Sequence, residues 1–419
     1  MSARVIPANK RKIINDPVYG FINFPFELVF DLVEHPYVQR LRRIKQLGLT
    51  NFVYPGANHT RFQHALGASF LMGSAIEVIR SKGHEITEAE AEAVTIAILL
   101  HDTGHGPFSH SLEASIIENI DHEKLSLLFM EKLNYQYNKH LELAINIFKN
   151  NYHKKFLHQL VASQLDMDRL DYLRRDSFFT GVTEGAIGSE RIIKMLNVKN
   201  DELVIDIKGI YSIEKFLVAR RLMYWQVYLH KAVLTAENML VSMLKRAKQL
   251  SLSGAKLFGT PELLFFLENH VNEDSFHPDK SGEILEMFSR LDDNDIVSAT
   301  KVWMNNKDKI LSFLCSSLLN RKLFRIQFQN QGFDINQVAT IKQKVCKVFG
   351  ISQEEAENLV FTGEVSNYAY SSLDDRIKIM DKTGKTRDIT EASDMINLAV
   401  LDKTVKRNFL CYPREIEKV

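Results

Sequence analysis

The chain has 419 residues, with 53 basic and 52 acidic side chains, a formal net charge of +1 and 45% hydrophobic residues. Such a chain can bury a real core in one large or two to three ordinary domains, and its near-zero charge gives little support for strong nucleic-acid or anionic-lipid binding, although a local basic pocket stays possible. No apolar run approaches the roughly 18 residues that a membrane helix needs, and the N-terminus lacks the apolar core of a signal peptide, so we expect a cytoplasmic protein without membrane contact. The cysteines have no CxxC spacing and fit reduced thiols: Cys315, Cys346 and Cys411.

The first predicted elements come before residue 110. A short strand signal lies in INFPF (22–26), and EAEAEAVTIAILLH (88–101) predicts an acidic first turn followed by a buried helix. A cluster of Gly104, Gly106 and Pro107 then stops this helix. The histidine and aspartate at 101 and 102 are therefore expected at a helix C-terminus that opens into a glycine loop.

The middle of the chain is predicted to be a helical bundle, because no proline lies between residues 107 and 261 and the sequence keeps helical periodicity. Residues 212–250 contain neither Gly nor Pro and predict one or two long helices. Strand signals lie at LVIDI (203–207), FRIQF (324–328) and IKIMD (377–381), and the KTGKT that follows the last suggests a hairpin.

These patterns predict a mainly α protein, in which a helical bundle core is followed by a smaller mixed α/β C-terminal region. The weakest boundary lies in the polar, glycine-containing stretch around 251–282. We therefore expect the helical core over 1–250 and the mixed region over 251–419. No internal repeat or low-complexity tract is visible.

Three short segments hold four side chains that can enclose one metal ion. RFQHALG contains His64, LLHDTGHGPFSH contains His101 and Asp102, and QLDMDRLDYLRRD contains Asp168. Alone, each histidine fits a core residue and each aspartate a helix cap. Together, two imidazoles and two carboxylates suit one divalent ion, with positions left for water and a phosphate oxygen, and the ligand types fit Mn, Fe, Mg, Ni, Co or Zn. The order H…HD…D therefore predicts hydrolysis of a phosphate ester.

The segments around these ligands resemble the HD-domain deoxynucleoside triphosphate triphosphohydrolase family. The similarity includes INDPVYGFI (14–22), QRLRRIKQLG (39–48), VYPGANHTRFQHALG (53–67) and YLHKAV (228–233), and it covers roughly residues 12 to 240 in order. The resemblance implies an HD-domain helical bundle core. It also implies a dGTPase-like enzyme that cleaves a dNTP to deoxynucleoside and inorganic triphosphate, with the metal at the α-phosphate.

The third metal segment also suggests a sugar-binding face. Asp168, Tyr172 and Asp176 fall at i, i+4 and i+8 and therefore lie on one face of a helix. The resemblance implies that Tyr172 packs against the deoxyribose and that Asp176 binds the 3′-hydroxyl. The neighbouring charged residues are interpreted as a solvated face: Asp171, Arg174 and Arg175.

Basic side chains near the metal are candidates for binding the phosphates, since arginine can hold phosphate oxygens bidentately. The resemblance assigns this role to Arg61, Arg169 and Arg220, and it places Tyr228 in the sugar pocket. The human member of the family has lysine at the position of Arg169 and histidine at that of Tyr224, and Arg220 fits a surface arginine nearly as well. Two further residues match positions near the base and sugar but fit a packing turn equally well: Gln46 and Leu47.

Release of a deoxynucleoside requires a proton on its 5′-oxygen, which a histidine can donate near neutral pH. The resemblance favours His122 as this acid, supported by His110 and Glu113, and His105 is expected to line the phosphate pocket. An ordinary loop histidine remains an alternative at each position. The remaining histidines of interest are interpreted as structural or solvated: His59, His84, His140, His153 and His158.

A second nucleotide site is implied near the N-terminus. The resemblance places a GTP- or dGTP-type activator between subunits and therefore implies a homo-oligomer, a dimer or tetramer. A capping asparagine and a surface arginine are equally good interpretations of two of its members, and a glutamate replaces the aspartate that reads guanine in the family. The candidate residues are Lys12, Ile13, Asn15, Glu34, Gln39 and Arg42.

Two other classes of function remain open. One is a different HD-type phosphohydrolase, acting on nucleoside monophosphates, a cyclic dinucleotide or a signalling nucleotide. The other is a non-catalytic protein that binds nucleic acid or a partner. The extended motifs argue against the first, and the four intact ligands argue against the second.

Overall fold

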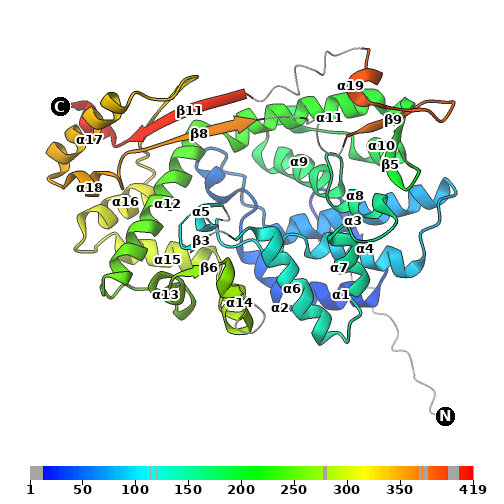
Figure 1. Ribbon diagram of the computed structural model, residues 1–419, viewed down its shortest axis with the longest axis horizontal. Helices are drawn as coiled ribbons and strands as arrows, with labels where there is room; N and C mark the ends of the chain where they lie inside the picture. Colours follow the sequence, from blue (N-terminus) through cyan, green and yellow to red (C-terminus); the bar gives the residue numbers. More distant parts are fainter. Residues whose placement is uncertain are drawn as a thin grey trace, which may run out of the picture.

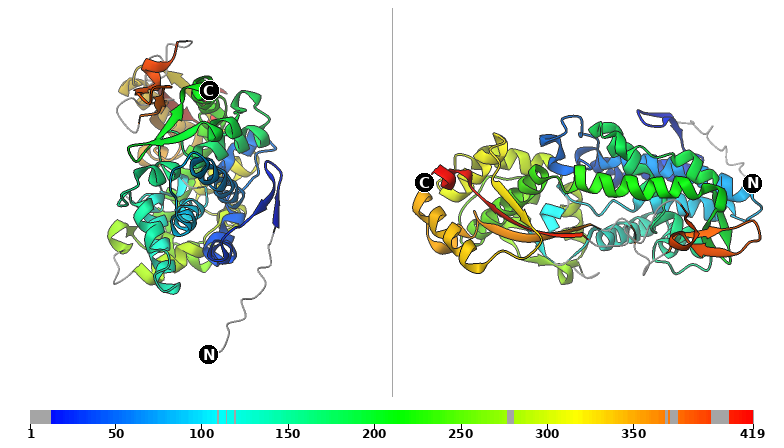
Figure 2. Two further views of the ribbon diagram at one scale, coloured as in Figure 1. Left: turned by 90° about the vertical axis from the view of Figure 1, so that its right-hand side faces the viewer. Right: turned by 90° about the horizontal axis from the view of Figure 1, so that it is seen from above.

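Helices build most of the computed structural model, which describes residues 13–108, 110–113, 115–118, 120–276, 281–367, 370, 376–394 and 405–418 (Figure 1). The prediction of a mainly α protein is confirmed. Figure 2 shows an elongated molecule in which the yellow and orange helices of the C-terminal region gather toward one end, whereas the orange-red segment with α19 lies near the other end. Among the described residues, no helix combines the length and the apolar character that a membrane span requires.

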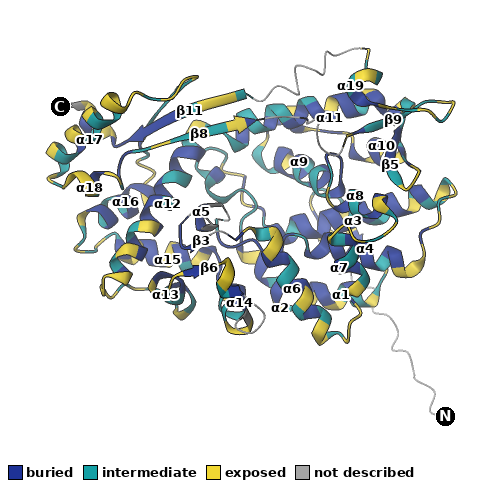
Figure 3. Cartoon of the chain, in the orientation of Figure 1, coloured by how far each residue is buried: buried dark blue, intermediate teal, exposed yellow. Residues whose placement is uncertain are grey.

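Helix α3 (Arg61–Ser81) forms the centre of the N-terminal half and packs against α4 (Glu88–Leu100) and α9 (Met167–Thr180). Its apolar residues are buried on several faces rather than along one stripe, because neighbours surround it (Figure 3). A capping box at Thr60 and Gln63 fixes its first turn, with the Thr60 amide donating to the Gln63 Oε1 at 2.9 Å. His64 therefore begins the second turn of a rigid, buried helix.

Helix α4 confirms the helix predicted over 88–101. Thr87 and Glu90 form a capping box at its start, and its alanine, isoleucine and leucine residues from Ala91 onward are buried. His101 caps its C-terminus and Asp102 follows in the glycine-containing loop. The predicted position of this pair is confirmed.

Two long helices occupy 210–252, as predicted for 212–250. Helix α11 (Ile210–Met223) continues through a π-helical turn (Tyr224–Tyr228) and is followed by α12 (Lys231–Leu252). The widened turn is anchored by the hydroxyl of Tyr54, which donates to the carbonyl of Gln226 at 2.6 Å. Such turns frequently occur at functional sites, because they redirect side chains along a helix.

The predicted strands 203–207, 324–328 and 377–381 are confirmed within two small sheets. One has the order β10-β9-β5-β4, with β9 parallel to β5 and antiparallel to β10; the other has the order β7-β11-β8 and is antiparallel. The bounds are β4 (Leu196–Lys199), β5 (Glu202–Asp206), β7 (Arg325–Gln329), β8 (Phe361–Asn367), β9 (Lys378–Met380), β10 (Thr386–Asp388) and β11 (Val405–Tyr412).

An antiparallel hairpin of β1 (Ile13–Asp16) and β2 (Gly20–Asn23) precedes the helical body. The strand signal at 22–26 thus begins earlier than predicted and ends before Pro25, which cannot donate to a ladder. A short parallel pair joins β3 (Ile117–Glu118) to β6 (Val271–Asn272). The other N-terminal helices are α1 (Glu27–Glu34), α2 (Pro36–Gln39), α5 (His110–Glu113), α6 (His122–Gln136), α7 (Glu142–Phe148), α8 (Lys155–Val161) and α10 (Ser189–Lys194).

The C-terminal region contacts the N-terminal half at several places. Its strand β9 lies beside β5, and α12 packs against α16. A division near residue 250 stays a prediction. The C-terminal helices are α13 (Pro261–Glu268), α14 (Ser281–Arg290), α15 (Asp293–Trp303), α16 (Lys309–Leu319), α17 (Ile335–Phe349), α18 (Gln353–Ala356) and α19 (Ile389–Ala392).

Two buried side chains hold the loop that follows Asp102. Arg40 donates to the carbonyls of Thr103 and His105 at 3.1 and 2.8 Å. Asp293, at the start of α15, accepts from the amide of Phe108 at 3.2 Å and from that of Lys45 at 2.9 Å. A single carboxylate of the C-terminal region therefore fixes this loop and the segment that leads to Gln46.

We expect the contribution of Asp293 to stability to depend on pH. Burial raises the pKa of Asp293 to about 6, whereas an unfolded aspartate titrates near ~3.9. The folded state binds this proton more tightly, so the free energy of unfolding should fall as pH rises through this window. Between about pH 4.5 and 7.5, the wild type should lose roughly 2 kcal/mol relative to Asp293→Asn. Urea unfolding of both proteins at the two pH values measures the difference in their free energies of unfolding. If this difference is the same at both pH values, the pKa of Asp293 is not raised in the folded state.

Candidate metal centre and cavity

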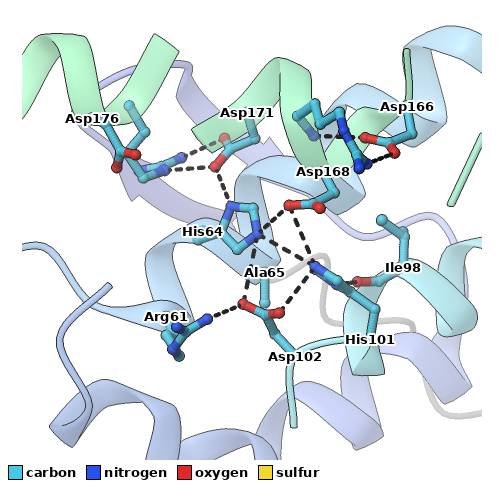
Figure 4. A network of polar contacts seen from close by, with 12 residues as sticks. Arg61, His64, Ala65, Ile98, His101, Asp102, Asp166, Asp168, Asp171 and Asp176 are labelled. Atoms are coloured by element: carbon cyan, nitrogen blue, oxygen red, sulfur yellow. Dashed lines mark hydrogen bonds and ion pairs between the residues drawn. The ribbon is translucent and has the colours of Figure 1, made fainter. Parts of the chain in front are cut away.

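Three of the predicted ligands converge from three helices. The Nε2 atoms of His64 and His101 lie 3.4 Å apart, and the Oδ1 atom of Asp168 lies 3.1 Å from the first and 3.6 Å from the second. We refer to His64, His101 and Asp168 as the metal group, because their ligand atoms lie close enough together to hold one metal ion. Figure 4 shows these side chains pointing toward one another from α3, the end of α4 and the start of α9.

The hydrogen bonds of the two histidines orient each ring so that its Nε2 atom can bind a cation. His64 Nδ1 donates to Asp171 Oδ2 at 2.7 Å, and His101 Nδ1 donates to the carbonyl of Ile98 at 2.6 Å. Each ring thus keeps its proton on Nδ1 and directs the Nε2 lone pair toward the other ring, which is the arrangement of metal-ligating histidines.

The surrounding carboxylates favour positive charge at the same point. Burial lowers the pKa of His64, but Asp168 and Asp171 outweigh it and raise that pKa to about 10. Burial likewise opposes the charge of His101, whereas Asp102 and Asp168 raise its pKa. A bound divalent ion satisfies the same electrostatic demand, so the residues present fit a metal.

Asp102, the fourth predicted ligand, lies beside this group. Its Oδ1 is 3.3 Å from His101 Nε2, and its Oδ2 is 3.8 Å from His64 Nε2. The same carboxylate accepts from Arg61 Nη1 at 2.6 Å and from His105 Nε2 at 3.2 Å. Asp102 therefore connects the metal group to the side chains of Arg61 and His105.

A cavity of about 750 Å³ opens beside the metal group. This volume is within the range of small-molecule sites, roughly 300–1,000 Å³. His64 is fully buried and is not among the described lining residues. The predicted residues that line the cavity are Gln46, Leu47, Arg61, His101, Asp102, His105, His122, Asp168, Arg169, Tyr172, Asp176, Arg220 and Tyr228.

The cavity wall also contains residues that the sequence patterns did not indicate. They come from α7, α8 and the loop after α8, which lie between the second and third metal segments in sequence. Because they carry no motif, only the folded chain identifies them. These residues include Phe148, His158, Val161 and Ser163.

Three arginines give the cavity a basic wall. Although burial opposes its charge, the Asp166 carboxylate raises the pKa of Arg169 above its ordinary value and forms an ion pair with it. Arg220 is only 6% exposed, which excludes the surface arginine considered from the sequence. With Arg61, these side chains place several donors near the metal group.

Asp176 and Tyr228 form the other polar part of the cavity. The Tyr228 hydroxyl donates to Asp176 Oδ2 at 2.7 Å, and His59 Nε2 donates to Asp176 Oδ1 at 2.7 Å. The Tyr172 ring meets the Tyr228 ring edge-on, with centroids 6.2 Å apart. Of the two interpretations of His59 from sequence, structural or solvated, its burial excludes the solvated one. Its distance from Asp176 in sequence gives no sign of the contact.

Two histidines stack at the loop between α4 and α6. The rings of His105 and His122 lie 3.8 Å apart at an angle of 15°. Burial and the charge of Arg61 lower the pKa of His105 to about 3. His122 begins α6 and is partly exposed to the cavity. The side chains of His110 and Glu113, at the two ends of α5, are outside the described part of the structure.

The solvated face interpreted for α9 is wrong at two positions. Asp171 and Arg175 are completely buried, because α3 and the N-terminal hairpin cover this side of the helix. Arg174 is partly exposed and lies over the ring of Tyr19, 4.9 Å from its centroid. Helical spacing alone could not reveal that a hairpin from the chain start covers these charges.

The predicted regulatory residues lie toward the surface. Ile13 and Asn15 are exposed on β1, and Glu34 is exposed at the end of α1. Arg42 donates to Gln39 Oε1 at 2.8 Å. Lys12 is outside the described residues. A nucleotide site at these residues stays a prediction.

The chain is similar to known proteins over most of its length. Residues 61–176 match a family model described as HD domain, and residues 187–260 match one described as HD associated region. The crystal structure of a phosphohydrolase from Bacteroides thetaiotaomicron superposes with a TM-score of 0.93 at 55% identity, over 97% of this chain and 100% of the other.

Two curated relatives extend this similarity. The uncharacterized protein YwfO of Bacillus subtilis is 34% identical over 325 residues, 76% of this chain and 72% of the relative. A protein of Dictyostelium discoideum named deoxynucleoside triphosphate triphosphohydrolase SAMHD1 homolog is 32% identical over 57% of this chain. The match spans only 50% of that relative's length.

Proposed function

The chain belongs to the HD-domain family of metal-dependent phosphohydrolases, and from that premise we propose that it hydrolyses 2′-deoxynucleoside 5′-triphosphates to deoxynucleoside and inorganic triphosphate. The observation that carries the proposal is the lining of one cavity of about 750 Å³ by His101 and Asp168 of the metal group, three arginines and a tyrosine–aspartate pair. A deoxynucleotide with a charged triphosphate requires all three kinds of partner.

The metal group is where we place the α-phosphate. A divalent ion held by His64, His101 and Asp168, with Asp102 beside them, supplies charge neutralisation and an activated water. The ion is Mn, Fe, Mg, Ni, Co or Zn. Arg61, whose guanidinium lies against Asp102, is positioned to bind a phosphate oxygen next to the reacting bond.

The rest of the triphosphate meets Arg169 and Arg220. The Nε of Arg169 is buried and has no hydrogen-bond partner among the described residues, so a phosphate oxygen would satisfy it. Several charges on one ligand favour several guanidinium groups on one wall. A monophosphate would leave part of this basic wall without a phosphate contact.

We place the sugar and the base against aromatic and hydrogen-bond-accepting side chains rather than arginines. Tyr172 offers an aromatic face for the deoxyribose, and Asp176 has lone pairs left to accept from a 3′-hydroxyl after binding His59 and Tyr228. The Oε1 of Gln46 is buried without a hydrogen-bond partner in the described part of the chain. A donor group of the base would satisfy this oxygen.

His122 is the proposed acid for the 5′-oxygen. It lines the cavity at the N-terminus of α6 and stacks on His105, which itself donates to Asp102. The His105 ring therefore places His122 next to the metal side of the cavity. Support from His110 and Glu113 belongs to the same proposal.

The proposal is tested by product analysis. Purified protein is incubated with each dNTP, the matching ribonucleotides and deoxynucleoside monophosphates, with each divalent metal in turn. We expect deoxynucleoside and triphosphate in equal amounts from dNTPs, and no release of pyrophosphate. Turnover of monophosphates alone would place the chain in another branch of HD-type phosphohydrolases.

Regulation by a purine nucleotide at an inter-subunit site is part of the proposal. The exposed positions of Ile13, Asn15 and Glu34 leave them accessible to a ligand or a second copy of the chain. Mass measurement in solution should show a dimer or tetramer that GTP or dGTP strengthens. A monomer under all conditions would remove the inter-subunit site and leave the catalytic proposal standing.

A further inference from the structure

The N-terminal hairpin is connected to the metal group through buried charges. We propose that Asp16 of the hairpin positions the metal ligand His64 through Arg175 and Asp171, so that correct docking of the hairpin sets how tightly the metal is bound. Asp16 and Arg175 are positioning residues in this proposal, since neither touches the metal group itself.

Four side chains form the connection, and each is hydrogen-bonded to the next. Arg175 Nη1 and Nη2 donate to the carboxylate of Asp16 at 2.7 and 3.3 Å. Arg175 Nε and Nη2 donate to Asp171 at 2.9 and 3.0 Å, and Asp171 Oδ2 accepts from His64 Nδ1 at 2.7 Å. Figure 4 shows His64 between Asp171 on one side and Asp168 on the other.

Burial makes this connection stiff. None of the four residues is more than 4% exposed. Arg175 holds each carboxylate through two hydrogen bonds, which fixes the plane of its guanidinium group. Removing one partner leaves a buried charge without compensation, so the remaining groups must shift. A shift of Asp171 would turn the His64 imidazole, because their hydrogen bond sets the direction of Nε2.

Helix α3 has a glycine, Gly67, at the point where Asp171 and Arg175 pack against its backbone. A Cβ atom at Gly67 would lie 2.0 Å from Asp171 Oδ1 and 2.3 Å from Arg175 Nη2. Gly67 follows His64 by three residues and faces the same side of the helix. A glycine in a helix interior costs up to about 1 kcal/mol relative to alanine. The chain carries that cost at the point where the carboxylate and guanidinium reach the backbone.

The hairpin turn depends on the same carboxylate. Asp16 Oδ1 accepts from the amides of Val18 and Tyr19 at 2.9 and 3.0 Å, so it shapes the turn that follows β1. Tyr19 then packs on Phe70 of α3, with ring centroids 5.2 Å apart. A change that removes or moves the Asp16 carboxylate therefore disrupts both the turn and the contact with Arg175.

The connection also offers a route from the surface to the metal. Ile13 and Asn15 lie on the same strand as Asp16, and Ile13 is 56% exposed. If the proposed regulatory nucleotide binds these residues, moving β1 would act on His64 through Asp16. That consequence rests on the proposed function, whereas the link to metal binding does not.

The test measures metal binding without any nucleotide. Binding of Mn²⁺ and Co²⁺ to the full chain is measured by calorimetry, together with the visible spectrum of the Co²⁺ form. We expect Asp16→Asn to weaken binding by about 10–100-fold and to change the Co²⁺ spectrum, with helical circular dichroism retained. Asp31→Asn, at an exposed position on α1, is the charge-matched control.

A pair of glycine variants tests the connection without removing a charge. Gly67→Ala should weaken metal binding, whereas Gly73→Ala in the same helix should not, because its Cβ meets nothing within 4 Å. If Asp16→Asn does not fold, this pair decides the question. Wild-type metal affinity in Asp16→Asn or in Gly67→Ala, with or without a loss of thermal stability, would overturn the proposal.

Discussion

Asp168→Ala is expected to lose both the bound metal and nearly all phosphohydrolase activity. The Oδ1 atom of Asp168 lies 3.1 and 3.6 Å from the two imidazole Nε2 atoms, so its removal leaves two neutral imidazoles and only the Asp102 carboxylate beside the cation. Because metal catalysis supplies several kcal/mol of transition-state stabilisation, kcat/KM should fall by roughly 10³-fold or more. Metal content after desalting and the initial rate of hydrolysis measure the two losses.

A matched control separates this effect from a general loss of carboxylate charge. Glu190→Ala removes an exposed carboxylate that forms an ion pair with Arg174 at 3.7 Å. We expect wild-type metal content and rate in that variant. An Asp168→Ala protein with full metal content and full activity would refute the assignment of the metal group.

His122→Asn should lower kcat by about 10²–10⁴-fold and leave the metal content unchanged. The ring lines the cavity and stacks on His105, but it does not belong to the metal group. A histidine acid should also produce a falling limb in the rate at high pH, which the variant should lack. The pH dependence of kcat for both proteins measures this limb.

The leaving group provides a sharper control for His122. A p-nitrophenolate leaves without a proton, so hydrolysis of a p-nitrophenyl phosphodiester should fall much less in His122→Asn than hydrolysis of a dNTP. His140→Asn, on the exposed surface, should affect neither substrate. Equal losses on both substrates would indicate that His122 positions the substrate rather than donating a proton.

The elements that carry the candidate metal ligands could be predicted from sequence because their signals are local. The acidic start and apolar run of α4 define that helix, and the glycine loop after it fixes where His101 and Asp102 lie. The spacing of Asp168, Tyr172 and Asp176 gives their shared face in the same way. All three line the cavity, as the helical spacing predicts.

The buried charges could not be predicted, because their partners are distant in sequence. Arg175 and Asp16 are separated by 159 residues, and nothing in the pattern of α9 distinguishes a solvated face from one covered by a hairpin. The contact between Asp293 and Lys45 spans 248 residues and has no motif. Sequence patterns reveal chemistry at a site, whereas tertiary packing decides what holds it in place.

The most direct test of the proposed reaction uses water enriched in heavy oxygen. Hydrolysis of a dNTP in this water is followed by phosphorus NMR and mass spectrometry of the products. If the cavity directs water to the α-phosphate and His122 protonates the 5′-oxygen, the label appears in inorganic triphosphate and the deoxynucleoside is unlabelled. Label in a deoxynucleoside monophosphate or in orthophosphate, with pyrophosphate or a diphosphate as the second product, would contradict the proposed reaction.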